Sequence, residues 1–273
     1  MPGKQITVKT LSSMRARGEK IVALTAYDYH TARLEALAGV HVILVGDSFQ
    51  MAVFGEETTL GAEMDVLVAH TEAVKKGAPG SLVVGDMPFG SYQPSDELAV
   101  SNAVRFIAEA GADAVKLEGG NSSAVSRIRA ITEAGIPVMA HIGLQPQSIR
   151  SEGSYRVVRA DSRDKLIEQV KAVAEAGAFS VVLEMVEEEL AAQVTEVSDI
   201  PTIGIGAGRK VDGQILVVND MLGMNGDFNP KFLRKYADLH SIMKDAFERY
   251  ASDVTSGGFP CEENVFRQRG GKS

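Results

Sequence analysis

Short β-branched runs alternate along this sequence with segments of helical spacing, and this alternation limits the chain to very few folds. Amphipathic stretches such as 64–77 and 96–111, with apolar residues three and four apart, lie between the runs. Strand and helix units in regular alternation predict a parallel sheet covered by helices. Eight runs follow this pattern: IVALT (21–25), HVILV (41–45), SLVVG (81–85), AVKL (114–117), PVMAH (137–141), SVVLE (180–184), TIGIG (202–206) and QILVV (214–218). Eight units in 273 residues predict a closed (β/α)₈ (TIM) barrel, for which about 250 residues are typical.

The junctions between predicted helices and strands repeat in sequence. AEAGADAVKLE (108–118) and AEAGAFSVVLE (174–184) agree at most positions, which indicates one structural module used more than once. Glycine accepts the left-handed backbone that ends many helices. We therefore expect helices to end at Gly111 and Gly177, with a short turn into the next strand.

Two segments do not fit this module. Residues 143–160, GLQPQSIRSEGSYRVVRA, form a long polar excursion after the fifth run, and such loops often serve as lids or binding loops. Helix-forming sequence follows the eighth run from about residue 230 to 250, and residues 252–273 are polar and rich in glycine. We expect a single barrel domain of residues 1–251 and a loosely ordered tail of residues 252–273.

Composition excludes several classes of function. The 28 basic and 36 acidic side chains give a net charge of -8, which disfavours nucleic acid and anionic membranes as partners. The N-terminus has no apolar segment after its charges, and no apolar run approaches the roughly 18 residues of a membrane span, so a cytoplasmic protein is expected. The single cysteine, Cys261, excludes an intramolecular disulfide and a cysteine-based zinc cluster.

Charged residues gather where the predicted strands end, and barrel enzymes carry their catalytic groups at these carboxyl ends. Taken singly, each has a structural alternative: a helix cap for the Asp or Glu residues, an ion pair with Glu118 for Lys116, or a core hydrogen bond for His141. Six such residues around one mouth favour a functional site. They are Asp47 after the second run, Asp86 after the third, Lys116 and Glu118 in and after the fourth, His141 in the fifth and Glu184 in the sixth.

Several carboxylates in one barrel mouth repel each other and lose hydration unless a cation joins them. Oxygen ligands without cysteine, and with one well-placed histidine, favour Mg²⁺ over Zn²⁺. A 2-oxo acid could chelate such an ion through two oxygens. Lys116 and His141 could then neutralise the substrate carboxylate or a developing enolate, and Glu184 is a candidate general base.

A weaker candidate is the glycine-rich segment 204–208, which is followed by Arg209 and Lys210. Glycine-rich turns after the seventh strand bind phosphate in many barrels. The same glycines are equally compatible with tight packing beneath a ligand.

Several longer motifs resemble the ketopantoate hydroxymethyltransferase family. The resemblance covers residues 5–262. The segments that carry it are LTAYDYHTARL (24–34), LVGDS (44–48), TTLGAEMDVLVAHTEAVKKGAP (58–79), GDMPFGSY (85–92), AGADAVKLEGG (110–120), VMAHIGLQPQS (138–148), VLEMV (182–186) and IPTIGIGAGRKVDGQILVVNDMLGM (200–224).

This resemblance implies a barrel of the phosphoenolpyruvate/pyruvate-like superfamily and a step of pantothenate biosynthesis. In that step a hydroxymethyl group passes from 5,10-methylenetetrahydrofolate to 3-methyl-2-oxobutanoate through a Mg²⁺-stabilised enolate. It also implies a homo-oligomer, commonly a decamer. Carried over by motif, the metal ligands are Asp47, Asp86 and Glu118, the substrate-binding residues are Asp47, Ser48, Asp86, Lys116 and His141, and the general base is Glu184.

The sequence departs from the family pattern beside the predicted metal loop. Phe49-Gln50 follows the Gly-Asp-Ser triplet where Leu-Gly is usual, and Gln145 stands where Thr is more usual. The bulkier pair could alter substrate or folate fit.

Two other functions stay open from the sequence. One is a Mg²⁺-dependent 2-oxo acid lyase or mutase of the isocitrate lyase and phosphoenolpyruvate mutase superfamily. Those lyases commonly carry a Lys-Cys-Gly-His loop, which this chain lacks. The other is a non-catalytic relative that binds metabolites or serves as a scaffold.

Overall fold

Eight parallel strands close into a barrel, as the sequence predicts. The structure is a computed structural model that describes residues 5–153 and 156–267. Each strand pairs with the next along the chain, and the last pairs with the first. The strands are β1 (Ile21–Thr25), β2 (Val42–Val45), β3 (Leu82–Asp86), β4 (Ala114–Glu118), β5 (Val138–Gly143), β6 (Ser180–Glu184), β7 (Thr202–Ile205) and β8 (Gly213–Leu216).

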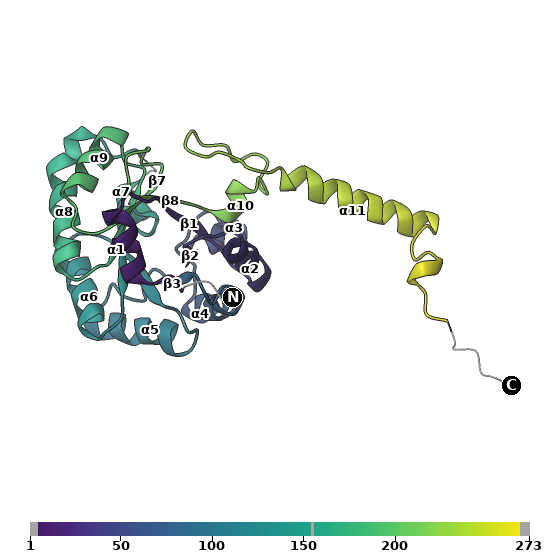
Figure 1. Ribbon diagram of the computed structural model, residues 1–273, viewed down its shortest axis with the longest axis horizontal. Helices are drawn as coiled ribbons and strands as arrows, with labels where there is room; N and C mark the ends of the chain where they lie inside the picture. Colours follow the sequence, from purple (N-terminus) through teal and green to yellow (C-terminus); the bar gives the residue numbers. More distant parts are fainter. Residues whose placement is uncertain (1–4, 154–155, 268–273) are drawn as a thin grey trace. The chain divides into compact units, whose positions relative to one another are not determined.

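Helices surround these strands, and Figure 1 shows α2, α4, α5, α6, α8 and α9 on the outside of the barrel. Asp28, Ser95 and Asn121 begin α2, α5 and α6 by accepting hydrogen bonds from first-turn amides. Gly177, with φ of 98°, directly follows the C-cap of α8 and confirms the expected glycine helix end, whereas Gly111, with φ of 70°, lies two residues beyond the C-cap of α5. The helices of this unit are α1 (Val8–Ala16), α2 (Tyr29–Leu37), α3 (Phe49–Ala52), α4 (Met64–Gly77), α5 (Asp96–Ala108), α6 (Ser122–Glu133), α7 (Ile149–Glu152), α8 (Arg163–Glu175) and α9 (Glu188–Val197), with 3₁₀ turns η1 (Pro146–Ser148) and η2 (Ala160–Ser162).

One expected helix is missing. The sequence pattern suggested a helical segment after every strand, but residues 206–212 connect β7 to β8 as an irregular turn. Seven residues that include Gly206 and Gly208, both with positive φ, are too few to leave the sheet, form a helix and return. The expectation of helical spacing after the seventh run was therefore wrong.

The barrel interior is filled by apolar side chains. Every strand contributes at least one, and Leu11 and Met14 of α1 belong to the same cluster. Their burial closes the end of the barrel at which the strands begin. The strand residues are Ile21, Ala23, Val42, Leu44, Leu82, Val84, Ala114, Met139, Val182, Ile203 and Ile215.

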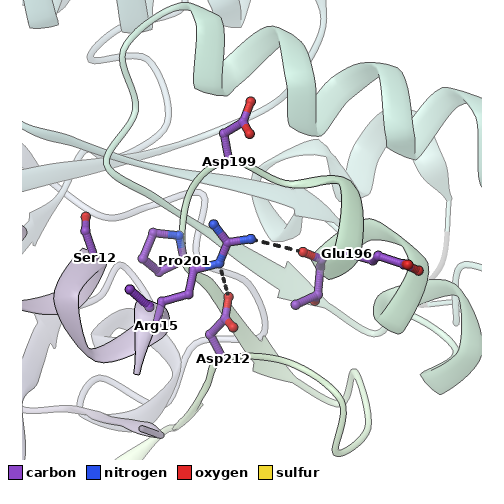
Figure 2. Close-up of a pocket in the computed structure, with 8 residues that line it drawn as sticks. Ser12, Arg15, Glu196, Asp199, Pro201 and Asp212 are labelled. Atoms are coloured by element: carbon purple, nitrogen blue, oxygen red, sulfur yellow. Dashed lines mark hydrogen bonds and ion pairs between the residues drawn. The ribbon is translucent and has the colours of Figure 1, made fainter. Parts of the chain in front are cut away.

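Arg15 fixes α1 across this amino-terminal end. Its Nε lies 3.2 Å from Asp212 Oδ2, and its guanidinium also donates to the carbonyl oxygens of Thr195 and Ser198. Figure 2 shows the guanidinium in a small pocket that Pro201 and Asp212 also line. Both residues come directly before a strand, so the pocket lies at the barrel end where residues usually serve stability.

The described chain divides into two compact units, one up to Val218 and one from Asn219 onward. Helix α10 (Val218–Met221) lies at the division, and the second unit holds α11 (Leu239–Ser256) and η3 (Glu262–Asn264). The helix expected over 230–250 thus starts later, where Asp238 caps it, and ends later, before Gly257 with φ 77°.

The expected domain boundary at residue 251 stays a prediction, and residues 268–273 of the expected tail lie outside the described residues. No helix in the described ranges is long and apolar enough to cross a membrane.

Glu35 is an acid buried in the packing of α2. Its side chain is 6% exposed, and neither carboxylate oxygen has a hydrogen-bond partner among the described residues. Burial, with a smaller contribution from Asp28, raises the pKa of Glu35 to about 8. The folded protein therefore binds this proton more tightly than the unfolded chain does.

We expect this group to make the free energy of unfolding fall as pH rises from about 4.5 to about 8. Glu35→Gln stays uncharged, so its stability relative to the wild type should increase by about 2 kcal/mol between pH 6 and pH 8. Urea unfolding at both pH values measures the difference. Glu133→Gln, at an exposed position on α6, is the control. A stability difference for Glu35→Gln that does not change with pH would contradict the prediction.

Candidate active site

The inward face of the barrel changes from apolar to charged near the carboxyl ends of its strands. Side chains two residues apart on a strand share a face. Because Ala114 belongs to the barrel core, Lys116 and Glu118 on the same strand also lie on the inward face. The same relation links Val84 to Asp86, Met139 to His141 and Val182 to Glu184. The two-residue alternation of side chains along each strand thus places five predicted residues above the apolar core.

Asp47, Asp86 and Lys116 form a buried group within this site. Lys116 Nζ donates to both oxygens of Asp86, at 2.8 and 2.9 Å. The Asp47 backbone N–H donates to Asp86 Oδ2 at 3.1 Å. Asp86 is 1% exposed, and the other two are 4% exposed. The structure therefore brings these three predicted residues together.

Ser48 lies in the same loop after β2. Its hydroxyl is 2.9 Å from the hydroxyl of Tyr27, which also accepts a hydrogen bond from Thr25. A Cβ on Gly46 would lie only 2.7 Å from Ser48 Oγ. A side chain at this glycine of the Gly-Asp-Ser triplet would therefore displace the Ser48 hydroxyl from its present position.

His141 lies between two acids from neighbouring strands. Its Nδ1 is 3.5 Å from Glu118 Oε1, and its Nε2 is 3.3 Å from Glu184 Oε2. Burial lowers the pKa of His141, and the nearby charge of Lys116 lowers it further, so the imidazole is neutral at pH 7. Neither ring nitrogen makes a well-aligned hydrogen bond within the described part of the chain. The ring can therefore still hydrogen-bond a bound molecule.

The acidic groups of this site outnumber its one lysine. Burial raises the pKa of Asp86 to about 7, and Asp47 adds to this effect although Lys116 opposes it. Burial also raises the pKa of Glu118 well above its ordinary value. Lys116 keeps its proton because the surrounding acids outweigh its burial. A further cation would relieve the remaining repulsion.

The donor chemistry fits a magnesium ion held by two carboxylates. Over residues 5–153 and 156–267, no group of three or more His, Cys, Asp or Glu side chains forms a ready metal cluster. Mg²⁺ needs fewer, since it commonly takes one or two carboxylates and completes its shell with water and substrate oxygens. Asp47 and Asp86 can supply such a pair. Glu118 accepts a hydrogen bond from the Gln147 backbone instead, so its metal role stays a prediction.

Two buried residues of the site were missed in the sequence. Gln147 on η1 donates from its side chain to Asp47 Oδ2, and the Tyr92 hydroxyl accepts from the Glu118 backbone N–H. Both are less than 5% exposed. One signal was present, because Gln147 falls in the polar excursion 143–160 that was expected to serve as a lid or binding loop.

The unusual pair Phe49-Gln50 is accommodated by local packing. The Phe49 ring is fully buried and lies 5.1 Å from the Phe54 ring and 5.4 Å from the His70 ring, measured between centroids. Gln50 is also buried, and a Cβ on Gly61 would lie 3.1 Å from its Nε2. The larger side chains therefore fill space around α3.

The glycine-rich turn after β7 is explained by packing. A Cβ on Gly208 would lie 2.5 Å from Glu188 Cβ. The Arg209 guanidinium donates to both oxygens of Glu188, at 2.7 and 2.9 Å. Arg209, which had suggested phosphate binding, is therefore paired with Glu188.

Comparison with known proteins gives close relatives and more distant structural neighbours. The ketopantoate hydroxymethyltransferase family matches residues 5–262. The 3-methyl-2-oxobutanoate hydroxymethyltransferase of Clostridium novyi (strain NT) is 52% identical over 96% of this chain and 95% of its own. The enzyme of the same name from Pseudothermotoga lettingae is 51% identical over 96% and 99%.

Solved structures show the same fold at low sequence identity. A 2,3-dimethylmalate lyase of the PEP mutase/isocitrate lyase superfamily has a TM-score of 0.61 at 16% identity, covering 96% of this chain and 92% of the lyase. Phosphonopyruvate hydrolase, solved with oxalate and Mg²⁺, has a TM-score of 0.61 at 13% identity, covering 94% and 92%. These neighbours confirm the predicted barrel fold, and the close relatives identify the chain as a member of the ketopantoate hydroxymethyltransferase family.

Proposed function

We propose that this transferase moves a hydroxymethyl group from 5,10-methylenetetrahydrofolate to 3-methyl-2-oxobutanoate and releases 2-dehydropantoate (ketopantoate) and tetrahydrofolate. One observation carries the proposal beyond family membership. Buried acids surround Lys116 inside the barrel mouth, and Glu184 lies at their edge, partly open to solvent. A site of this kind binds an anionic oxo acid at one end and removes its proton at the other.

Substrate binding would use the buried part of the site. Lys116 would attract the anionic oxo acid, and the Ser48 hydroxyl would donate a hydrogen bond to one of its oxygens. Asp47 and Asp86 would hold Mg²⁺, with Glu118 reached through water. The ion, when bound, would polarise the oxo acid and so acidify the C–H next to its keto group.

Proton removal would fall to Glu184. Its side chain is 20% exposed, whereas that of Glu118 is 2% exposed, so Glu184 can pass the proton to solvent. The neutral ring of His141, 3.3 Å away, would orient the Glu184 carboxylate. The resulting enolate carbon would form a C–C bond to the folate-borne methylene. Water would then replace the folate nitrogen on that carbon, which gives the hydroxymethyl group.

We also propose that the chain assembles as a homo-oligomer, with the homodecamer as the form that the family resemblance implies. None of the residues of α11 is buried in this chain, although the helix has an apolar stripe with a spacing of three and four. A second copy could cover this stripe. Its exposed members are Met243, Phe247, Tyr250 and Val254. The expected cytoplasmic location stays a prediction.

Product formation tests the function directly. We expect the protein to form ketopantoate from 3-methyl-2-oxobutanoate and 5,10-methylenetetrahydrofolate with Mg²⁺ and not with EDTA, as quantified by mass spectrometry. If no product forms, solvent deuterium incorporation into the oxo acid should be measured in the same samples. Exchange without product would retain the enolate site and overturn the folate assignment. Neither signal would overturn the proposed function.

Replacement of the proposed base should stop proton removal and leave metal binding intact. Glu184→Gln is expected to lower deuterium exchange and product formation by about 10²–10⁴-fold, because the amide cannot take up the proton. Calorimetry should give an unchanged Mg²⁺ affinity. The matched control is Glu189→Gln, at an exposed position on α9. Exchange at the wild-type rate in Glu184→Gln would exclude this residue as the base.

A charge on the apolar stripe of α11 should weaken the assembly. Phe247 is 63% exposed in the chain, and Phe247→Glu would place a carboxylate in the proposed interface. Light scattering coupled to size exclusion should show a smaller particle than for the wild type. Ser252→Glu adds the same charge on the opposite side of the helix and should leave the mass unchanged. Equal masses for all three proteins would argue against this interface.

A further inference from the structure

Gln147 makes more contacts to the acids of the site than its place in an irregular loop would suggest. Its backbone N–H donates to Glu118 Oε2 at 3.0 Å. Its Nε2 donates to Asp47 Oδ2 and to the Met87 carbonyl, both at 3.0 Å. Its Oε1 accepts from the Tyr92 hydroxyl at 2.7 Å and from Gln93 Nε2 at 3.1 Å. The side-chain amide therefore uses both donors and both acceptor positions.

The orientation of this amide follows from a chain of donors and acceptors. The Gly90 backbone N–H can only donate, and it donates to Gln93 Oε1 at 2.6 Å. The other end of the Gln93 amide is therefore a donor, and it faces Gln147. The atom it meets must be the Gln147 oxygen, so the Gln147 NH₂ group faces Asp47.

Tyr92 supports the same orientation. Its hydroxyl oxygen accepts from the Glu118 backbone N–H at 3.1 Å, and the hydroxyl lies closer to Gln147 Oε1, at 2.7 Å, than to the Glu118 carbonyl oxygen, at 3.3 Å. A flipped amide would place an NH₂ group against the Gln93 donor and an oxygen against the Asp47 carboxylate. Both changes are unfavourable in a buried position, where unmatched polar groups cost most.

We propose that Gln147 is a positioning residue that fixes the carboxylate of Asp47, and that Gly90, Gln93 and Tyr92 set the direction of its amide. The polar excursion after β5 thereby completes the site on β2 and β4. This inference rests on the proposed function in one respect, because Asp47 is taken there as a ligand of Mg²⁺. Partners of this kind commonly change metal affinity or activity by about 10- to 100-fold when they are replaced.

Four variants test the proposal. Gln147→Met removes the side-chain donor and keeps the backbone contact to Glu118, so it reports on Asp47. Gln93→Glu keeps an acceptor for Gly90 but presents an oxygen to Gln147, which favours the flipped amide. Gln93→Met removes that donor without adding an acceptor, so Tyr92 still orients the amide. Gln193→Met, at an exposed position on α9, is the control outside the site.

The main measurement is Mg²⁺ affinity by calorimetry on the folded proteins, with thermal unfolding recorded alongside. We expect Gln147→Met and Gln93→Glu to weaken binding by about 10- to 100-fold, Gln93→Met by less than about threefold, and Gln193→Met not at all. A merely structural role would lower the unfolding temperature without this order of affinities. Wild-type affinity in both Gln147→Met and Gln93→Glu would overturn the proposal.

Crystal structures of the wild type and Gln147→Met test the positioning role of Gln147 separately from the proposed function. If the wild type itself binds no Mg²⁺, the metal assignment fails, but the position of the Asp47 carboxylate can still be compared between the wild type and Gln147→Met. A rotated carboxylate would support the positioning role. An unchanged carboxylate would overturn it, whatever reaction the protein catalyses.

Discussion

The buried ion pair between Lys116 and Asp86 is the interaction on which the rest of the site depends. Losing one partner of such a pair commonly costs about 3–5 kcal/mol, because the other charge is left without compensation. Lys116 also interacts electrostatically with Asp47 and Glu118, which hold its pKa high against its burial. One ammonium group therefore allows three acids to lie directly above the apolar layer of the barrel. The acids in excess of this one lysine are the basis of the proposed site for a further cation.

A difference in burial separates Glu184, the proposed base, from Glu118. Glu118 and Glu184 lie on either side of His141, but their side chains are 2% and 20% exposed. A catalytic base must return its proton to solvent in each cycle, whereas carboxylates that bind a cation work best away from competing water. The neutral imidazole between them can orient one carboxylate without adding a charge that would weaken it as a base.

The strand-end residues could be predicted because one rule, a period of two along each strand, governs both the core and the site. Ala114, Lys116 and Glu118 follow this rule on a single strand. Gln147 could not be predicted in the same way, because its position depends on how an irregular loop returns to the barrel. The Leu144 backbone N–H bonds to the Glu184 carbonyl, and Val158 forms a bridge to Val186, so distant contacts set the path of that loop. The absence of a helix between β7 and β8 could have been predicted from the length of the connection, since only seven residues separate the two strands.

The barrel alone does not decide between the transferase and a lyase or mutase, because neighbours at 13–16% identity share it. Family membership does distinguish them, since relatives 51–52% identical to this chain carry the transferase name. A lyase must return a proton to the enolate that bond cleavage leaves behind, and the Lys-Cys-Gly-His loop expected of such lyases is absent from this sequence. Here the lone cysteine, Cys261, is exposed and caps η3 in the second unit, and His141 is held neutral by burial. In the proposed reaction the enolate carbon takes up the folate-borne methylene instead of a proton, so Glu184 can serve as the base without returning its proton to that carbon.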